Sequence, residues 1–201
     1  MALDSLMSVT KSITIRIQRM PKGHPFLGSL FARYGSRSSV NKALSRLVQA
    51  GALERVVRGV YMRPKATKYV GNVRASALAV MRLMTKANGE TVQIHGAEAV
   101  RLMGLSTQMQ VLPIFYTSGT TRQIHVGNTT LRLQHTSKDR FQHAGTKVGV
   151  ALTALHYIGK EALSFEIASQ IQQALSEDEF RTLQACQMPG WMRAALTLVN
   201  I

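Results

Sequence analysis

The segment from Arg37 to Ala50 alternates apolar and polar residues with the period of a helix. Its apolar residues recur at the i, i+3, i+4, i+7 and i+8 positions of one helix face: Val40, Ala43, Leu44, Leu47 and Val48. Ser36 precedes the segment and can accept a hydrogen bond from the first turn, while Gly51 follows it and favours termination. The pattern predicts an amphipathic helix that begins near Arg37 and ends near Ala50.

The opposite face of this helix contains no acidic residue. At about 100° per residue it presents hydroxyls, amides and cations: Ser38, Lys42, Ser45 and Gln49, flanked by Ser39, Asn41 and Arg46. Arg37 lies near the apolar stripe, but its place in the first turn lets it reach outward. A solvated face usually mixes both signs of charge, whereas these side chains can approach phosphates and base edges without repulsion. The face therefore favours an anionic partner, although the helix alone fits a solvated helix in a small basic domain about equally well.

A basic hairpin is predicted directly after this helix. The runs 53–57 and 60–62 are rich in β-branched residues and surround Arg58-Gly59, which indicates two short strands with a tight turn. Arg55, Arg58 and Arg63 would lie along this hairpin and could grip a DNA backbone beside the groove that the helix enters. Upstream, the apolar positions of 3–20 predict a first helix. The segment 25–34 predicts a short second one, with Phe26, Leu27, Leu30 and Phe31 on one side.

The order helix, helix, recognition helix and wing is that of a winged helix-turn-helix, which we expect over residues 1–65. The polar stretch up to Gly71-Asn72 is interpreted as a linker. Beyond it, helices are predicted at 73–87, 96–103, 148–158, 164–175, 177–187 and 191–199, and strands at 91–94, 111–116, 123–126 and 129–134. The last two strands flank Gly127-Asn128, a favoured hairpin loop, and Ile124, Val126, Leu131 and Leu133 alternate with polar neighbours.

The predicted fold class is therefore α+β, with an N-terminal winged helix-turn-helix and a C-terminal α+β domain over residues 66–201. This second domain would hold a small antiparallel sheet and end in helices. Thr146 is interpreted as a helix cap, and Ser176 with Glu179 three residues later as a capping box. Cys186 is the single cysteine, so no internal disulfide can form, and its apolar setting predicts a buried thiol.

Charge narrows the choice of partner. The chain has 201 residues and a formal net charge of +15. Residues 1–65 hold 12 Lys or Arg against Asp4 and Glu54, which gives +10, and residues 66–201 hold 13 against 8 acids, which gives +5. Such a surplus favours nucleic acid over an anionic membrane surface, because the sequence has no amphipathic helix with aromatics beside its cations. There is also no apolar run long enough for a membrane span and no signal pattern, so we expect a cytoplasmic protein.

Catalytic and metal sites find little support in the sequence. The six histidines are scattered, and none pairs at the i, i+4 spacing that would mount two ligands on one helix face. Gly145-Thr146-Lys147 superficially resembles a phosphate loop. That motif needs Gly-Lys-Ser/Thr with a further glycine upstream of it, and the segment meets neither requirement. The hydroxyl-rich segment 117–122, which ends at Arg122, could hold a phosphate, although a solvated loop is the favoured interpretation. We therefore expect no enzyme activity, no cofactor and no metal.

Four blocks of the chain together resemble the antitoxins of AbiE-type abortive-infection systems, including their DUF6088 relatives. They are, in order, GSRSSVNKALSRLVQAGALERVVRGVYMRP, IHGAEAVRLMGLSTQ, VGNTTLRLQH and GTKVGVALTALHYIGK. The resemblance implies a type IV antitoxin that represses its own promoter, often at inverted repeats, and counteracts a nucleotidyltransferase-like toxin without forming a stable complex. The chain lacks the toxin's own pattern, because neither Gly28-Ser29 nor Gly35-Ser36 is followed by Asp-x-Asp/Glu.

Three functional hypotheses follow. The first is a double-stranded-DNA-binding autorepressor and antitoxin that uses Arg37, Ser38, Ser39, Asn41, Lys42, Ser45 and Arg46 of the helix and Arg55, Arg58 and Arg63 of the wing. The second is a solitary regulator, or an RNA or protein interaction module, without a toxin partner. The third is a nucleotide-acting enzyme that uses Arg122 in the hydroxyl-rich loop.

Overall fold

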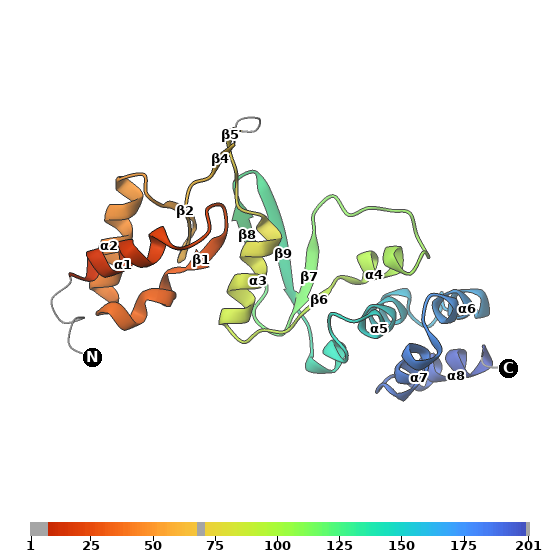
Figure 1. Cartoon of the computed structure of the whole chain (residues 1–201). Helices are drawn as coiled ribbons and strands as arrows, with labels where there is room; N and C mark the ends of the chain where they lie inside the picture. Colours follow the sequence, from red (N-terminus) through yellow and green to blue (C-terminus); the bar gives the residue numbers. More distant parts are fainter. Residues whose placement is uncertain (1–7, 68–70, 200–201) are drawn as a thin grey trace. The chain divides into compact units, whose positions relative to one another are not determined.

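The computed structural model describes residues 8–67 and 71–199. The chain has an α+β fold (Figure 1) and divides into two compact units. The first unit comprises Met1–Ala87 together with His125–Thr129. The second comprises Asn88–Ile124 and Thr130–Ile201.

The first unit has the element order of a winged helix-turn-helix. It contains α1 (Val9–Gln18), β1 (Pro25–Leu27), the 3-10 helix η2 (Gly28–Tyr34), α2 (Arg37–Gln49), β2 (Glu54–Val57) and β3 (Val60–Met62). These are followed by β4 (Ala66–Thr67), β5 (Gly71–Asn72) and α3 (Ala77–Ala87). The strands β1, β3 and β2 form one antiparallel sheet with β3 in the middle. Of the first helix predicted over 3–20, residues 3–7 lie outside the described residues.

The helix α2 confirms the prediction from the hydrophobic pattern. The Ser36 hydroxyl caps its first turn by accepting the N–H of Ser39 at 3.3 Å. Gly51 terminates it with a φ of +69°, a conformation that glycine adopts without the steric penalty of a Cβ. The apolar stripe is buried, with Val40, Ala43, Leu44 and Leu47 all inside and Val48 half-buried.

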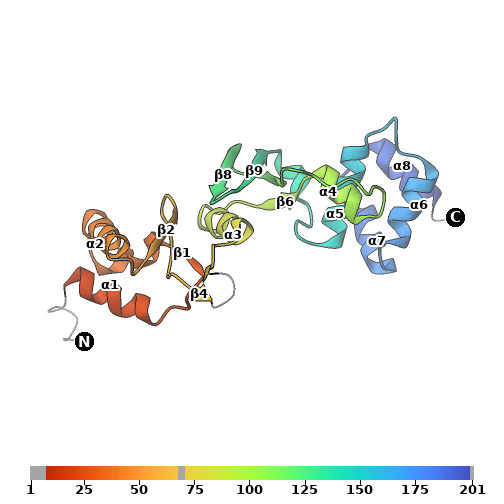
Figure 2. The ribbon, with the colours of Figure 1, turned by 90° about the horizontal axis from the view of Figure 1, so that it is seen from above.

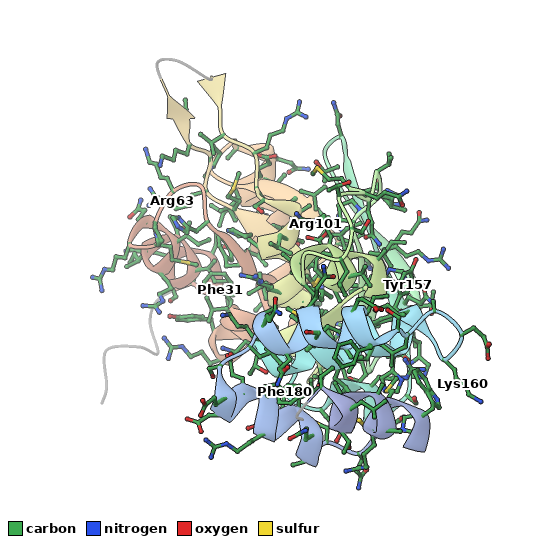
Figure 3. All side chains as sticks on the ribbon, turned by 90° about the vertical axis from the view of Figure 1, so that its right-hand side faces the viewer. Phe31, Arg63, Arg101, Tyr157, Lys160 and Phe180 are labelled. Carbon is green, nitrogen blue, oxygen red and sulfur yellow. The ribbon has the colours of Figure 1, made fainter. Side chains whose placement is uncertain are left out.

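One hydrophobic core joins α1, η2 and α2 to the sheet. Phe31, labelled in Figure 3, is fully buried at its centre. It meets Phe26 edge-on with 5.8 Å between ring centroids. Phe26 also stacks on Tyr61, which neighbours it across the β1–β3 pair. Ile13 from α1 and Leu44 from α2 complete the fully buried centre. Burying side chains of this size stabilises the unit by about 1.5–3 kcal/mol each.

The short second helix predicted over 25–34 is wrong in its first part. Pro25–Leu27 forms the edge strand β1, which pairs with β3, and only Gly28–Tyr34 is helical, as a 3-10 helix. Proline lacks a backbone N–H and is tolerated at the start of an edge strand. Pairing with β3 decides the conformation, and such a long-range partner leaves no local periodic signal. Leu30, expected on the buried side, is 48% exposed.

The segment interpreted as a linker is partly structured. Ala66 pairs with Asn72 and Thr67 with Gly71 in a two-stranded antiparallel ladder, while residues 68–70 lie outside the described residues. After this ladder, α3 packs against β1, so it belongs to the same compact unit as the winged helix. By its packing, the segment 66–87 therefore belongs to the first compact unit. The functional boundary after residue 65 stays a prediction.

The second unit begins with a small sheet, apart from the hairpin residues His125–Thr129, which group with the first unit. Its strands are β6 (Val92–Ile94), β7 (Ile114–Thr117), β8 (Arg122–Val126) and β9 (Thr129–His135), in the order β6-β7-β9-β8. The β8–β9 hairpin is as predicted, and its four alternating apolar residues are buried. The predicted antiparallel sheet, however, is mixed, because β7 pairs in parallel with β9, for example Ile114 with Arg132. Residue alternation defines the faces of a strand but not its neighbour.

Helices form the rest of the second unit (Figure 2). They are α4 (Gly96–Leu102), the 3-10 helix η3 (Lys138–Phe141), α5 (Lys147–Ile158), α6 (Phe165–Gln173), α7 (Glu177–Ala185) and α8 (Gly190–Leu198). The helix α5 is buried along most of its length and packs against α4 and α7. The predicted Thr146 cap, the Ser176–Glu179 capping box and the buried Cys186 are all confirmed.

Gly149 in α5 is a point of close backbone approach. A Cβ at this position would overlap the carbonyl oxygen of His143 and come within 2.6 Å of Gln93 Nε2. The first of these neighbours is backbone and cannot rotate away. The sequence of α5 therefore needs a glycine where the chain between η3 and α5 crosses it.

We expect Gly149→Ala to lower the free energy of unfolding by about 1–3 kcal/mol, the range for overpacking a buried site. Urea-induced unfolding of the full chain measures this change. The matched control is Gly190→Ala in α8, where a Cβ would meet nothing within 4 Å. That variant should be neutral, or more stable by up to about 1 kcal/mol, because alanine favours a helix over glycine. Equal stability of the two variants would contradict the close-packing argument.

Candidate nucleic-acid interface

The polar face of α2 is exposed along the helix. Its exposed residues are Arg37, Ser38, Asn41, Lys42, Ser45, Arg46 and Gln49, while Ser39 is half-buried. The hydroxyls at the N-terminus are partly engaged, since Ser36 Oγ lies 2.9 Å from Ser39 Oγ and 3.3 Å from Ser38 Oγ. Within the described residues, the cations and amides further along form no side-chain hydrogen bond. The face thus offers exposed donors beyond a hydrogen-bonded first turn.

The β2–β3 hairpin lies beside α2 and is short. Arg58 and Gly59 form its two-residue turn, and Gly59 has a φ of +81°. The pairing shifts register between Arg55 and Val57, which indicates a bulge in β2. Two backbone bonds fix the hairpin to its surroundings, because Gly28 N–H donates to Gly59 O at 2.9 Å and Leu53 N–H donates to Leu47 O at 3.1 Å.

An open groove of about 840 Å³ lies between α2, the hairpin and η2. Its polar lining consists of Ser29, Arg37, Asn41, Ser45, Arg55 and Arg58. Its apolar side chains are Leu27, Ala32, Val40, Val48 and Tyr61. None of the described residues that line it is acidic. Five of the residues predicted from the sequence are thereby brought to one groove, and Ser29 is an addition that only the fold reveals.

The other predicted residues of α2 do not line this groove. Ser38, Lys42 and Arg46 lie one position further along the helix than Arg37, Asn41 and Ser45, which turns them by about 100°. The helix therefore carries two polar rows, a groove row and an outer row. The sequence pattern of the helix alone does not distinguish the two rows. Only the position of the hairpin beside α2 shows which row lines the groove.

Arg63 differs from the other arginines of the predicted site. Its side chain is directed at the C-terminal end of α1, where Nη1 donates to Gln18 O at 2.8 Å and to Met20 O at 2.6 Å (Figure 3). These carbonyls lie at a helix end, where the backbone lacks intrahelical partners and attracts a cation. This placement favours a structural role for Arg63 over the predicted phosphate contact.

Charge is distributed very unequally between the two units. Met1–Ala87 holds 16 Lys or Arg against Asp4 and Glu54, a net charge of +14, and the tip His125–Thr129 adds no Lys, Arg, Asp or Glu. The second unit holds 9 against 8 acids, a net charge of +1. Within the described residues, no carboxylate lies within ion-pair distance of Arg37, Arg55 or Arg58. The positive charge at the groove is not neutralised by these neighbours.

The hydroxyl-rich loop of the second unit is engaged in its own structure. Arg122 forms an ion pair with Glu90, in which the single nitrogen Nη2 donates to both carboxylate oxygens at 2.8 and 2.9 Å. Thr117 Oγ1 donates to the same carboxylate at 2.8 Å. Burial acts to raise the pKa of Glu90, but hydrogen bonds from Asn88, Arg122 and Thr117 bring this pKa below its usual value. Arg122 thus neutralises a carboxylate of its own chain. This arrangement gives the enzyme hypothesis no support.

A search of the described ranges for three or more His, Cys, Asp or Glu side chains that could hold a metal ion finds no such group. No helix in the same ranges is long and apolar enough to cross a membrane.

Most of the chain matches a known protein family. Residues 12–183 match the family model DUF6088, described as a family of unknown function. The chain belongs to the DUF6088 family. No curated protein and no solved structure matches it. The DUF6088 match runs from α1 to α7 and so includes the whole groove and most of the second unit.

In this DUF6088 member we expect Arg63→Ala to lower the free energy of unfolding by about 1–3 kcal/mol, because two carbonyls at the end of α1 lose a charged donor. Thermal unfolding followed by circular dichroism measures the effect. Arg58→Ala is the matched control, since its exposed side chain should change stability by less than about 0.5 kcal/mol. If Arg63→Ala melted like the wild type but bound DNA more weakly, the structural role would be refuted.

Proposed function

We propose that this chain is a DNA-binding repressor of its own promoter and the antitoxin of a type IV, AbiE-like system. The observation that carries the DNA-binding half is the acid-free polar face of α2 beside a cationic hairpin, in a unit with a net charge of +14. Nucleic acid is the polyanion that best fits such a surface, because phosphates supply a regular array of negative charge.

The dimensions of α2 are compatible with reading a duplex. At 13 residues and about 1.5 Å per residue it is about 20 Å long, and the major groove of DNA is about 12 Å wide. In the proposed complex α2 enters the major groove, and Arg55 and Arg58 hold the backbone beside it. Base edges in that groove present donors and acceptors that Ser, Asn, Lys and Arg side chains recognise.

We expect Lys42→Ala combined with Arg46→Ala to weaken binding to a duplex from the chain's own upstream region by at least about tenfold, since a lost base or phosphate contact costs about 1–3 kcal/mol. The wild-type affinity should fall steeply with salt, with a log–log slope of about −5 for about 6 phosphate contacts. Gel-shift titrations at several salt concentrations measure both quantities.

The control for charge loss is Arg82→Ala combined with Lys86→Ala on α3, which removes two exposed cations from the same unit. This variant should bind nearly as well as the wild type. Unchanged affinity of the Lys42 and Arg46 variant would refute the recognition helix. Equal affinity of the wild type for its own and a scrambled duplex, with an RNA or protein that co-purifies, would favour the interaction-module hypothesis instead.

The antitoxin half of the proposal rests on the resemblance to AbiE-type antitoxins. The second unit, nearly neutral and built around the buried helix α5, is the part of the chain that the DNA-binding proposal does not use. We assign to it the action against a nucleotidyltransferase-like toxin encoded next to this chain. A stable complex between toxin and antitoxin is not expected.

Co-expression tests this assignment. The adjacent nucleotidyltransferase should arrest growth when expressed alone, and the full-length chain should relieve that arrest. The DNA-binding variant with Lys42→Ala and Arg46→Ala should relieve it equally when both genes are expressed from promoters that the chain does not control. If neither chain relieved the arrest, or no nucleotidyltransferase gene lay nearby, the chain would be a solitary regulator.

A further inference from the structure

We infer that the groove between α2 and the hairpin holds the sugar-phosphate backbone of one DNA strand, so that the outer row of α2 alone reads bases. The inference rests on the proposed DNA binding and divides its residues into two functions. Arg37, Asn41 and Ser45 become backbone contacts together with Arg55 and Arg58. Ser38, Lys42 and Arg46 become the base-reading residues.

The first reason is geometric. Arg37, Asn41 and Ser45 recur every four residues and line the groove, whereas Ser38, Lys42 and Arg46 follow them by one position and lie on the outer row. Rows about 100° apart on a helix point in different directions, so each row meets a different part of a surface that the helix approaches. When a helix lies in the major groove, one row can face the floor where the bases lie, and the next row faces a flanking backbone. The hairpin stands beside the groove row, so the groove row is the one that meets the backbone.

The second reason is the chemistry of the groove. Three arginines give it cationic groups, and Asn41, Ser29 and Ser45 add short hydrogen-bonding side chains. The groove also has apolar side chains: Leu27 of β1, Val40 and Val48 of α2, and Tyr61 of β3. A sugar-phosphate strand matches this combination, because its phosphates seek cations and its sugar carbons can cover apolar surface. Base edges that lay against these apolar side chains would lose hydrogen bonds to water at those positions.

The third reason is that the charge at the groove has no competing partner. No carboxylate of the described residues pairs with Arg37, Arg55 or Arg58, whereas Arg101, Arg122 and Arg181 of the second unit all form ion pairs. Arg63, also in the first unit, is held by backbone carbonyls. Of the arginines named in the predicted wing, Arg55 and Arg58 line the groove and Arg63 does not. The groove therefore gathers cations that no carboxylate in the described structure neutralises.

The test compares groove and outer-row variants of the full chain on two duplexes, the chain's own upstream sequence and a scrambled sequence of equal length. Arg37→Ala and Arg58→Ala should weaken binding to both duplexes by the same factor. Each should also make the log–log salt slope shallower by about 0.9, the value for one lost phosphate contact. Lys42→Ala should weaken binding to the upstream sequence by a larger factor than binding to the scrambled one.

Replacing single phosphates of the upstream duplex by neutral methylphosphonates gives a second, direct readout. The wild type should bind more weakly when particular phosphates are replaced. The affinity of Arg58→Ala should be unchanged by replacement at one of these positions. Arg82→Ala serves as the control for charge, because this exposed residue on α3 does not line the groove. It should keep the wild-type slope and the wild-type sensitivity at every phosphate.

The outcomes separate the two proposals. If the wild type binds neither duplex, the proposed DNA binding itself is refuted, and the groove assignment with it. If the wild type binds and both groove variants behave like Arg82→Ala, only the groove assignment is refuted. A third outcome is that Arg37→Ala and Arg58→Ala lose affinity only for the upstream sequence, with an unchanged salt slope. That result would place the groove row on the bases and would also overturn the groove assignment.

Discussion

The burial of the apolar stripe of α2 is the constraint on which the candidate interface depends. Leu44 is fully buried in the core around Phe31, which fixes the rotation of α2 about its own axis. The polar rows are then exposed by necessity. The C-terminal end is fixed as well, since Leu47 O accepts both Ala52 N–H and Leu53 N–H and thereby leads the chain directly into β2. The helix and the hairpin are held in one geometry by these contacts, and the groove is the space that remains between them.

The two units differ in net charge and in how far their cations are paired. Like charges repel, so a net charge of +14 on residues 1–87 costs stability unless a polyanion neutralises it. The second unit pairs several of its cations with its own carboxylates, as in Arg122 with Glu90 and Arg101 with Glu98. The first unit leaves the groove arginines without such pairs among the described residues. The match to the DUF6088 family includes residues of both units, the basic first unit and the nearly neutral second one.

The alternation of apolar residues was enough to predict several local elements. It predicted α2, which Ser36 and Gly51 bound in the sequence, and it predicted the β8–β9 hairpin with its buried face. Capping is a local interaction, and the Ser176–Glu179 box was recognisable for that reason. Pro25–Leu27 could not be predicted as a strand, because β1 exists only through its pairing with β3. The parallel pairing of β7 with β9 was missed for the same reason, since register and neighbour are chosen by segments far apart in the chain.

The sequence by itself determined which side chains are available to meet an anion: the cations and short polar groups of α2 and the arginines of the hairpin. Only the tertiary structure decided which of them act together. Folding the hairpin beside α2 gathers Arg37, Asn41 and Ser45 with Arg55 and Arg58 around one groove, adds Ser29, and separates the outer row. It also assigns Arg63 to the end of α1. The reason is physical, because helical period fixes directions within one element, whereas the meeting of two elements depends on the core that packs them.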